Sequence, residues 1–286
     1  MDGEFRYERL TWPEIDAAAT EGAMVVVPVG STEDHGYHLP LEVDQRIPEA
    51  VAERTAEGRD DALRFPVIPQ GYLPHHMDYP GGVTIGWETF VNYCIDVGAS
   101  LAHHGFERVL FLNGHGSNHH LLEQATRQVN LQYPGVRAAM CSWWDLHEVR
   151  ETFAEESTAG PRGSGHGGEL ETSVYAYLYP DRVGEDRRED FHLPEVDSWL
   201  GRDLTGRPRA AATDVTMMPW WSTISETGLI GDATAGDPET GEAILAAAVA
   251  GLDRVLDDFA AYPIRDVDDH HSRAVADREY DPFRPR

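Results

Sequence analysis

The chain has 286 residues, a length that suits one large α/β domain, and its composition is strongly acidic. Its 50 aspartates and glutamates outnumber its 23 basic residues, all of them arginine, which gives a formal net charge of −27. Because such a surface repels phosphate backbones and anionic membranes, nucleic-acid and membrane-surface functions are disfavoured.

The same composition bears on the environment of the protein. Excess carboxylate without lysine favours a halophilic protein that stays hydrated in high salt, although arginine in place of lysine also follows from base composition. The two cysteines, Cys94 and Cys141, lie far apart in sequence. A disulfide between them is an alternative that the sequence leaves open, but so few cysteines favour a reduced compartment. No N-terminal segment resembles a signal peptide and no apolar run is long enough to span a bilayer, so we expect a cytoplasmic protein.

Short apolar segments alternate with longer amphipathic ones along the chain, a pattern typical of βαβ units and a mostly parallel sheet. The predicted strands, in chain order, are Ala23–Val29, Arg64–Ile68, Arg108–Leu112 and Val136–Cys141. The predicted helices are Ile47–Glu57, Trp87–His104, Asn118–Gln132, Glu169–Leu178 and Pro238–Ala261. The last helix is the clearest, because Pro238 suits a first turn and one apolar stripe follows it. The alternation predicts an α/β fold.

Two further stretches carry weaker signals. Residues 180–236 are rich in glycine, proline, tryptophan and acids, which predicts long loops of a kind that is often functional. Within them, the methionine and tryptophan cluster at 217–221 is expected to pack in the core or at an interface, with the lining of a pocket as the alternative. We expect a single domain over residues 1–262 and a charged C-terminal tail over residues 263–286.

The first predicted strand runs directly into an acid–imidazole–acid set made by Glu33, His35 and Asp44. Glu33 and His35 are two residues apart, so in extended backbone their side chains point the same way. Asp44 follows nine residues later, and Gly36 and Pro40 can turn the intervening loop. Carboxylates with imidazoles are ligands of Zn, Mn or Fe, and parallel strands place functional groups at this end. The alternative is a set of ordinary caps and turn formers with solvated charges.

The third predicted strand continues into the run from Asn113 to Gly116 and then into a helix. A glycine-bracketed turn in this setting presents His115 at the carboxyl edge of the sheet and directs helix N–H groups to the same space. Ser117 or Asn118 alternatively serves only to cap the helix. A phosphate cradle is disfavoured, because lysine is missing and the glycine spacing matches neither nucleotide-binding fingerprint.

A third segment, residues 163–173, runs from a glycine-rich loop into a helix. His166 precedes the first helical turn and Glu169 lies within it, where the helix dipole favours a carboxylate whether or not it binds an ion. Glu171 is rotated from Glu169 by about 200° and is expected to be structural. Serine and cysteine nucleophiles lack support, because no strand leads into a Gly-x-Ser-x-Gly elbow and neither cysteine has a neighbouring histidine. The residues therefore favour a metal-dependent hydrolase.

Taken together, the three segments resemble the creatininase (creatinine amidohydrolase) family. The matching runs are Gly30-Ser-Thr-Glu-Asp-His-Gly-x-His-Leu-Pro-x-x-x-Asp44, Asn113-Gly-His-Gly-x-Asn118 and His166-x-Gly-Glu-x-Glu-Thr-Ser173. Weaker matches are Tyr79-Pro-Gly-Gly-Val-Thr84 and Thr227-Gly-x-x-Gly-Asp232, so the resemblance covers residues 20–260. It implies a three-layer α/β/α fold with a mostly parallel central sheet, a two-metal centre and a homo-oligomer, often a hexamer.

The resemblance also implies roles for individual residues. Glu33 and His115 would hold one metal and His35 the other, with Asp44 bridging both ions. His166 matches the catalytic histidine of the family.

The sequence departs from the namesake enzyme at one metal ligand. Creatininase has Tyr-Glu after its Asn-Gly-His motif, and that glutamate ligates metal, whereas this chain has Gly116 and Ser117. By similarity to other members, Glu169 is the expected replacement ligand. Trp144 resembles the substrate-covering tryptophan of the family, and N–H groups near Gly116 are expected to stabilise the developing oxyanion. The Trp-Asp pair that precedes the catalytic histidine in the namesake is missing, so creatinine is not the expected substrate.

The resemblance therefore implies a metal-dependent amidohydrolase that cleaves a non-peptide C–N bond, in a cyclic amide or a formamide, of a small-molecule substrate. Two divalent ions (Zn, Mn or Fe) would activate a water, and His166 would move its proton to the leaving nitrogen. Three alternatives stay open. They are a deformylase of a ribosylaminopyrimidine in flavin or deazaflavin synthesis, with Arg46 and Arg162 as candidate phosphate ligands; a member that trims a short peptide; and a non-catalytic metal-binding scaffold.

Overall fold

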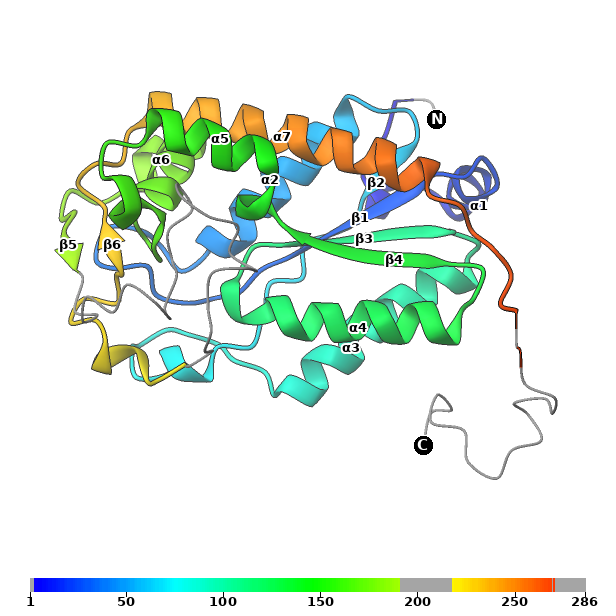
Figure 1. The fold of residues 1–286 in the computed structure, drawn as a ribbon, viewed down its shortest axis with the longest axis horizontal. Helices are drawn as coiled ribbons and strands as arrows, with labels where there is room; N and C mark the ends of the chain where they lie inside the picture. Colours follow the sequence, from blue (N-terminus) through cyan, green and yellow to red (C-terminus); the bar gives the residue numbers. More distant parts are fainter. Residues whose placement is uncertain (1–2, 191–217, 269, 271–286) are drawn as a thin grey trace.

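The computed structural model describes residues 3–190, 218–268 and 270, and its centre is a parallel sheet in the order β2-β1-β3-β4 (Figure 1). The strands of this sheet are β1 (Met24–Val29), β2 (Ala62–Arg64), β3 (Arg108–Asn113) and β4 (Arg137–Ser142). The central strands β1 and β3 pair in parallel from Val25 with Val109 to Val29 with Asn113. Both therefore end at the same edge of the sheet, where the loops that carry the predicted site residues begin.

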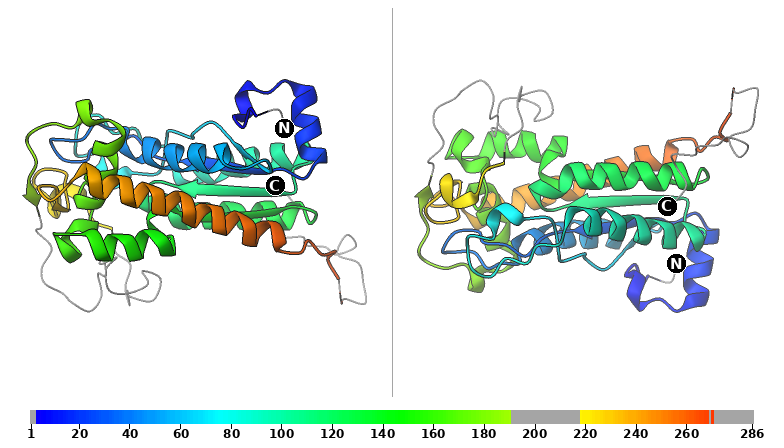
Figure 2. Two further views of the ribbon diagram at one scale, coloured as in Figure 1. Left: turned by 90° about the horizontal axis from the view of Figure 1, so that it is seen from above. Right: turned by 90° about the horizontal axis from the view of Figure 1, so that it is seen from below.

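Helices cover both faces of this sheet. They are α1 (Trp12–Thr20), α2 (Val43–Glu57), α3 (Trp87–His103), α4 (His119–Gln132), α5 (His147–Glu156), α6 (Glu169–Leu178) and α7 (Pro238–Ala261). Figure 1 shows α2, α5, α6 and α7 on one side of the sheet and α3 and α4 on the other. The views from above and below in Figure 2 show α7 (orange) crossing one face and α4 (green) crossing the other.

The layers follow from the alternation of side chains along the central strands, because successive strand residues point to opposite faces. Val26 and Leu110 belong to the hydrophobic cluster that includes apolar side chains of α2, α5, α6 and α7. Val25 and Val109 belong to the cluster that includes apolar side chains of α3 and α4. A strand buried on both faces needs apolar residues at every position, which is how β1 reads. The predicted three-layer α/β/α fold with a parallel central sheet is thus confirmed.

The structure departs from the predicted elements in three ways. Helix α2 begins at Val43 rather than at the predicted Ile47. The second strand covers Ala62–Arg64 rather than Arg64–Ile68, and Ile68 makes only an isolated bridge to Val29. Prolines at 66 and 69 explain the shift, because proline has no N–H to donate to a sheet. Helices α1 and α5 add to the predicted set. The N–H of Thr11 donates to Glu14 Oε2 (2.6 Å) at the start of α1, a capping signal that the sequence analysis did not use.

The predicted loop region at 180–236 contains only short elements where the structure describes it. The strand β5 (Glu189–Asp190) pairs antiparallel with β6 (Gly231–Asp232), and a 3-10 turn covers Trp221–Thr223. Met217, at the start of the predicted methionine and tryptophan cluster, and most of the predicted tail over 263–286 lie outside the described residues. Among the helices of the described residues, none combines the length and the apolar character that a membrane crossing requires.

Candidate metal centre

The four metal ligands predicted from the first two motifs lie together at the carboxyl edge of the sheet. Glu33 and His35 come from the loop after β1, and His115 follows β3 directly. Asp44 occupies the first turn of α2, whose N-terminus points at the same space. All four side chains are buried, although each of them carries ionisable oxygens or nitrogens that water would solvate better. Such a cluster requires compensating charges inside the protein.

Asp44 lies at the middle of this cluster. Its Oδ1 is 3.0 Å from His35 Nε2, and its Oδ2 is 3.1 Å from His115 Nδ1. Ser31 Oγ also donates to Oδ2 (2.9 Å). The Asp44 backbone can come this close to the strand ends because of two glycines: a Cβ on Gly30 or Gly114 would lie only 2.4 Å or 2.2 Å from the Asp44 carbonyl oxygen. Each oxygen of one carboxylate therefore faces a different imidazole.

Backbone carbonyls behind the two imidazoles fix which nitrogen of each ring carries hydrogen. His35 Nδ1 lies 3.2 Å from the Glu33 carbonyl oxygen, and His115 Nε2 lies 3.1 Å from the Tyr72 carbonyl oxygen. A carbonyl can only accept, so these nitrogens donate, and the neutral rings keep their lone pairs at the front. There each lone pair meets carboxylate oxygens at hydrogen-bonding distance. Acceptors that face each other in this way need a cation between them, either protons or metal ions.

The charges of the cluster shift its pKa values accordingly. Burial disfavours the charged form of His35, but the Asp44 carboxylate outweighs burial and raises the pKa of His35 to about 10. Burial likewise opposes a charge on His115, and Glu33 and Asp44 together hold its pKa well above the usual value. Burial raises the pKa of Glu33 to about 7. The front nitrogens of His35 and His115 therefore occupy positions that hold positive charge.

Glu33 gives independent evidence that the cluster suits a cation. Its side chain is fully buried, and neither carboxylate oxygen accepts a hydrogen bond from any group among the described residues. The closest cationic partner is His115 Nδ1, 3.1 Å from Oε1, which also faces Asp44 and cannot donate its single hydrogen to both oxygens. Buried carboxylate oxygens without donors are costly, and coordination of a divalent ion would satisfy them. The donor set thus fits a metal centre.

The third motif contributes Glu171 to this cluster, and not the predicted Glu169. Glu171 Oε2 lies 3.8 Å from His35 Nε2 and accepts a hydrogen bond from the N–H of Gly167 (2.6 Å). Glu169 points the other way, because its oxygens accept from Thr158 N (2.8 Å), Ala159 N (3.1 Å) and the Ser157 hydroxyl. The two glutamates do face opposite sides of α6, as their spacing predicted. Glu171, rather than Glu169 as predicted, is therefore the glutamate of α6 that faces His35.

His166 lies beside the cluster, as predicted, with its ring centroid 4.2 Å from that of His35. Its Nε2 donates to the carbonyl oxygen of Asp34, so the neutral ring keeps a lone pair on Nδ1, which is 3.6 Å from Glu33 Oε1. Burial lowers the pKa of His166 well below its usual value, so the ring is neutral at pH 7. A neutral imidazole with a free lone pair can accept a proton.

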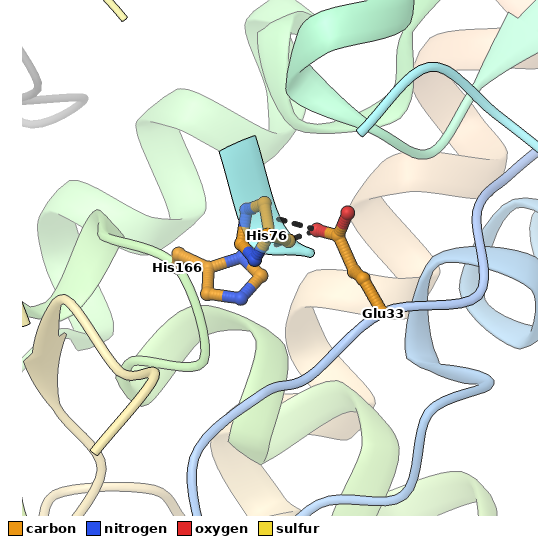
Figure 3. Close-up of side chains that lie close together, drawn as sticks. All are labelled: Glu33, His76 and His166. Atoms are coloured by element: carbon orange, nitrogen blue, oxygen red, sulfur yellow. Dashed lines mark ion pairs between the residues drawn. The ribbon is translucent and has the colours of Figure 1, made fainter. Parts of the chain in front are cut away.

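His76, which is not among the predicted site residues, lies next to His166 and Glu33 (Figure 3). His76 ends a 3-10 turn (Pro74–His76); its Nε2 is 3.8 Å from Glu33 Oε1, and its Nδ1 is 2.9 Å from Asp34 Oδ1. The segment that starts at Tyr79 resembles the family weakly, and His76 lies three residues before it. This position was the only sequence signal for His76, because a histidine pair in a loop has no periodic pattern.

The two predicted substrate-binding residues lie in different surroundings. Gly116 is exposed at the start of a 3-10 turn after His115, with open space where a Cβ would point. Trp144 is buried in the cluster that includes α7 and packs edge-on against Trp143. The tryptophan that contacts the site is Trp221, whose ring stacks on His76 at a centroid distance of 4.3 Å. Trp221 belongs to the loop region for which we predicted core or interface packing.

Three overlapping groups of side chains meet the spacing that a metal ion needs, with ligand atoms within 4.8 Å of one another. One is Glu33, His35 and Asp44; the second is His35, His166 and Glu171; the third is Glu33, His76 and His166. Together the three groups contain six different side chains, which is enough donors for more than one ion.

Comparisons with known proteins agree with this geometry. A family described as creatininase, creatinine amidohydrolase, matches residues 8–256 of the chain. Creatinine amidohydrolase of Pseudomonas putida is 33% identical over 200 residues, which cover 65% of this chain and 75% of that protein. A mycofactocin precursor peptide peptidase of Mycolicibacterium smegmatis is 33% identical over 238 residues, covering 81% and 84% of the two chains.

Solved structures give the same result for the fold. A structure described as creatininase with Mn superposes with a TM-score of 0.73 at 26% identity, covering 90% of this chain and 99% of that chain. A mutant creatininase of Zn–Zn type superposes with a TM-score of 0.71 at 27% identity, covering 90% and 98%. Both matches cover nine tenths of this chain.

Proposed function

The chain belongs to the creatininase family of amidohydrolases, and from this premise we propose that it uses two divalent metal ions to hydrolyse a non-peptide C–N bond of a small amide. The observation that carries the proposal is the arrangement around Asp44. Its two oxygens face His35 and His115, and the carbonyls behind these rings leave each with a lone pair at the front. A pair of cations on either side of Asp44 would satisfy all of these groups at once.

The residues suggest which side chains hold each ion. Glu33, His115 and one oxygen of Asp44 would hold the first, and His35, Glu171 and the other oxygen of Asp44 would hold the second. Three carboxylates and two imidazoles, with no thiolate, suit Zn, Mn or Fe. The Mn and Zn–Zn forms of the similar creatininase structures support the same choice of metals.

Bound in this way, the ions would lower the pKa of a water and polarise the substrate carbonyl. The protein supplies the proton transfer. His166, anchored through Nε2 on the Asp34 carbonyl, presents Nδ1 to the reacting groups, where it accepts the proton of the water and delivers it to the leaving nitrogen. Gly116 leaves open space beside His115, where the substrate can approach backbone N–H groups that stabilise negative charge.

A second candidate function is the trimming of a short peptide. The peptidase relative matches 81% of this chain, more than the 65% matched by the Pseudomonas putida enzyme, at the same identity. The site chemistry does not separate the two, because peptide and non-peptide amides need the same water, the same proton carrier and the same carbonyl polarisation. The deformylase and the non-catalytic scaffold are further outcomes of the test below.

The test measures metal content and amide hydrolysis on the full chain. Purified protein is assayed against cyclic amides including creatinine, against N-formyl compounds and against short peptides, with release of amine or formate as the readout. We expect bound divalent metal and turnover of at least one non-peptide amide. Turnover of peptides alone would favour the second candidate, and metal without any amine or formate release would indicate the scaffold.

Two variants connect this activity to the proposed ligands. Glu33→Gln or His115→Ala should remove bound metal and nearly all turnover, because each removes a ligand from a buried centre. His120→Ala is the matched control, since this histidine has a side chain 78% exposed on α4. Full activity of either ligand variant after chelation and dialysis would contradict the assignment.

The environment and assembly of the protein remain predictions of the sequence. We propose a cytoplasmic, halophilic homo-oligomer. If the net charge of −27 reflects adaptation to salt, the melting temperature should rise as KCl increases from dilute buffer to molar concentration, because screening relieves the repulsion among carboxylates. Light scattering under the same conditions measures the oligomeric state.

A further inference from the structure

His76 is held in one orientation by contacts on three sides. Its Nδ1 is 2.9 Å from Asp34 Oδ1, its face stacks on Trp221 at 4.3 Å, and the ring of His75 meets it edge-on at 4.6 Å. The residue is 1% exposed. A buried side chain fixed in this way keeps its remaining polar atom in one direction, which is the requirement for a selective contact with a ligand.

The remaining polar atom of His76 is a hydrogen-bond acceptor. The Asp34 carboxylate can only accept, so Nδ1 of His76 carries the hydrogen and Nε2 carries the lone pair. The backbone carbonyl of the same Asp34 accepts from His166 Nε2, which leaves the lone pair of His166 on Nδ1. Asp34 thus fixes two imidazoles at once, and their acceptor nitrogens lie 3.8 Å and 3.6 Å from the same oxygen, Glu33 Oε1 (Figure 3).

The surroundings of Asp34 and Trp221 strengthen this orientation. The indole Nε1 of Trp221 donates to the carbonyl oxygen of Gly228 (2.9 Å), which closes the turn over the site. Gly228 has a φ of +85°, and a Cβ there would lie 2.3 Å from Asp34 Oδ2, so its backbone packs directly on the carboxylate. One short turn therefore seats both the aromatic face and the carboxylate that hold His76.

The proposed mechanism leaves the Nε2 atom of His76 without a role. Each of the two positions beside Asp44 already has three protein ligands, the usual number in a catalytic zinc site, and His166 is used for proton transfer. Nε2 lies 3.8 Å from Glu33 Oε1, which the proposed first ion already uses. A substrate group that carries hydrogen can donate to Nε2.

We propose that His76 Nε2 accepts a hydrogen bond from an N–H group of the substrate next to the scissile carbonyl. This assignment rests on the proposed function and narrows its substrate class to primary and secondary amides, because a tertiary amide has no N–H to offer. A site built to receive a donor discriminates strongly against an analogue that lacks it, since its buried acceptor would then stay unpaired.

The inference can be tested without knowing the natural substrate. Acetohydroxamate and N-methylacetohydroxamate both chelate divalent metals, but only the first has an N–H. Calorimetric titration of the metal-loaded full chain gives the ratio of their dissociation constants. We expect the His76→Phe variant to lower the preference for acetohydroxamate by about five- to tenfold relative to wild type, the value of one hydrogen bond. Intrinsic differences between the two chelators cancel in this comparison of variants.

His75→Phe is the matched control, because phenylalanine keeps an aromatic ring edge-on to His76 and removes only the imidazole nitrogens. His75 is 7% exposed and also contacts Trp221, but its Nε2 is paired with the Ser117 hydroxyl (3.2 Å). This variant should keep the wild-type preference. His76→Gln retains an acceptor oxygen and should keep part of the preference, which separates a recognition role from a packing role.

Each outcome decides the assignment. An unchanged ratio in His76→Phe, or an equal loss in His75→Phe, overturns it. If His76→Phe loses bound metal and His75→Phe does not, the assignment is overturned in favour of a metal-ligand role for His76. A wild-type protein that binds no divalent metal contradicts the proposed function and the inference with it, whereas a loaded protein with no N–H preference contradicts only the inference.

Discussion

The candidate centre has two halves, and their histidines carry opposite electrostatic properties. In the half around Asp44, carboxylates hold the pKa of His35 and His115 above the usual value, despite burial. In the half around Asp34, burial dominates and lowers the pKa of His76 and His166. The first half therefore suits cations, and the second suits neutral acceptors for protons and N–H groups. Hydrolysis of an amide needs both.

The largest effect should follow from removing the group that joins the first half together. Asp44→Ala deletes a carboxylate shared by both proposed metal positions, so we expect loss of both ions and a fall in kcat/KM of roughly 10³-fold or more. Metal analysis and steady-state kinetics on the same sample measure the result. Retention of two ions per chain by this variant would contradict the claim that the half around Asp44 holds the metal ions.

A paired substitution on α6 should have opposite consequences for metal content and stability. Glu171→Gln should reduce bound metal, because Glu171 faces His35. Glu169→Gln should leave the metal content unchanged but lower the free energy of unfolding by about 1–3 kcal/mol, because Glu169 accepts hydrogen bonds from the backbone of Thr158 and Ala159. Chelator-free metal analysis and urea unfolding distinguish these effects. The reverse pattern would restore Glu169 as the ligand.

The same two halves predict how pH affects the metal-free protein. The folded pKa of His35, about 10, exceeds the unfolded value, so the stabilising charge is present below about pH 6.5 and is lost as pH rises toward 10. Without metal, the free energy of unfolding should therefore fall on the alkaline side, by up to about 1.4 kcal/mol per pH unit for one proton.

Metal ions replace those protons, so the loaded protein should lose less stability over the same range of pH. Urea unfolding at several pH values, with and without EDTA, makes the comparison. Equal alkaline losses in both forms would indicate that the ions do not occupy the positions in front of His35 and His115.

A smaller effect should follow from a substitution beside the turn that packs against Asp34 in the second half of the centre. Buried Asp190 accepts hydrogen bonds from Ser225 Oγ (3.0 Å) and from the N–H groups of Glu226 and Thr227 (both 2.9 Å), in the turn next to Gly228. Asp190→Asn should loosen that turn and lower kcat/KM by about three- to tenfold at unchanged metal content. Asp186→Asn, at an exposed acid, is the control. Loss of metal would show that the halves are not separable.

The sequence predicted the first half of the centre much better than the second. Glu33, His35 and His115 follow strands whose apolar runs are plain, and parallel strands end at one edge, so their convergence with Asp44 could be foreseen. The choice between Glu169 and Glu171 could not, because periodicity shows that they face opposite sides of a helix but not which side meets the site.

The second half depends on irregular backbone, for which sequence patterns give little guidance. His76 lies in a 3-10 turn and Trp221 in another, more than a hundred residues apart, and neither turn has a periodic signal. Their meeting depends on Gly228 packing against Asp34, a close approach that only the folded structure reveals. Of the two missed helices, α1 has a capping box that was not used, whereas α5 begins after Leu146 without a side-chain cap.

The account is tested most directly by anomalous diffraction from crystals of the full chain soaked with Mn²⁺. It predicts two peaks, one on each side of the Asp44 carboxylate, with His115 and Glu33 at the first and His35 and Glu171 at the second. A single peak distant from Asp44, or no manganese peak at all, would contradict the two-metal centre on which the proposed hydrolysis depends.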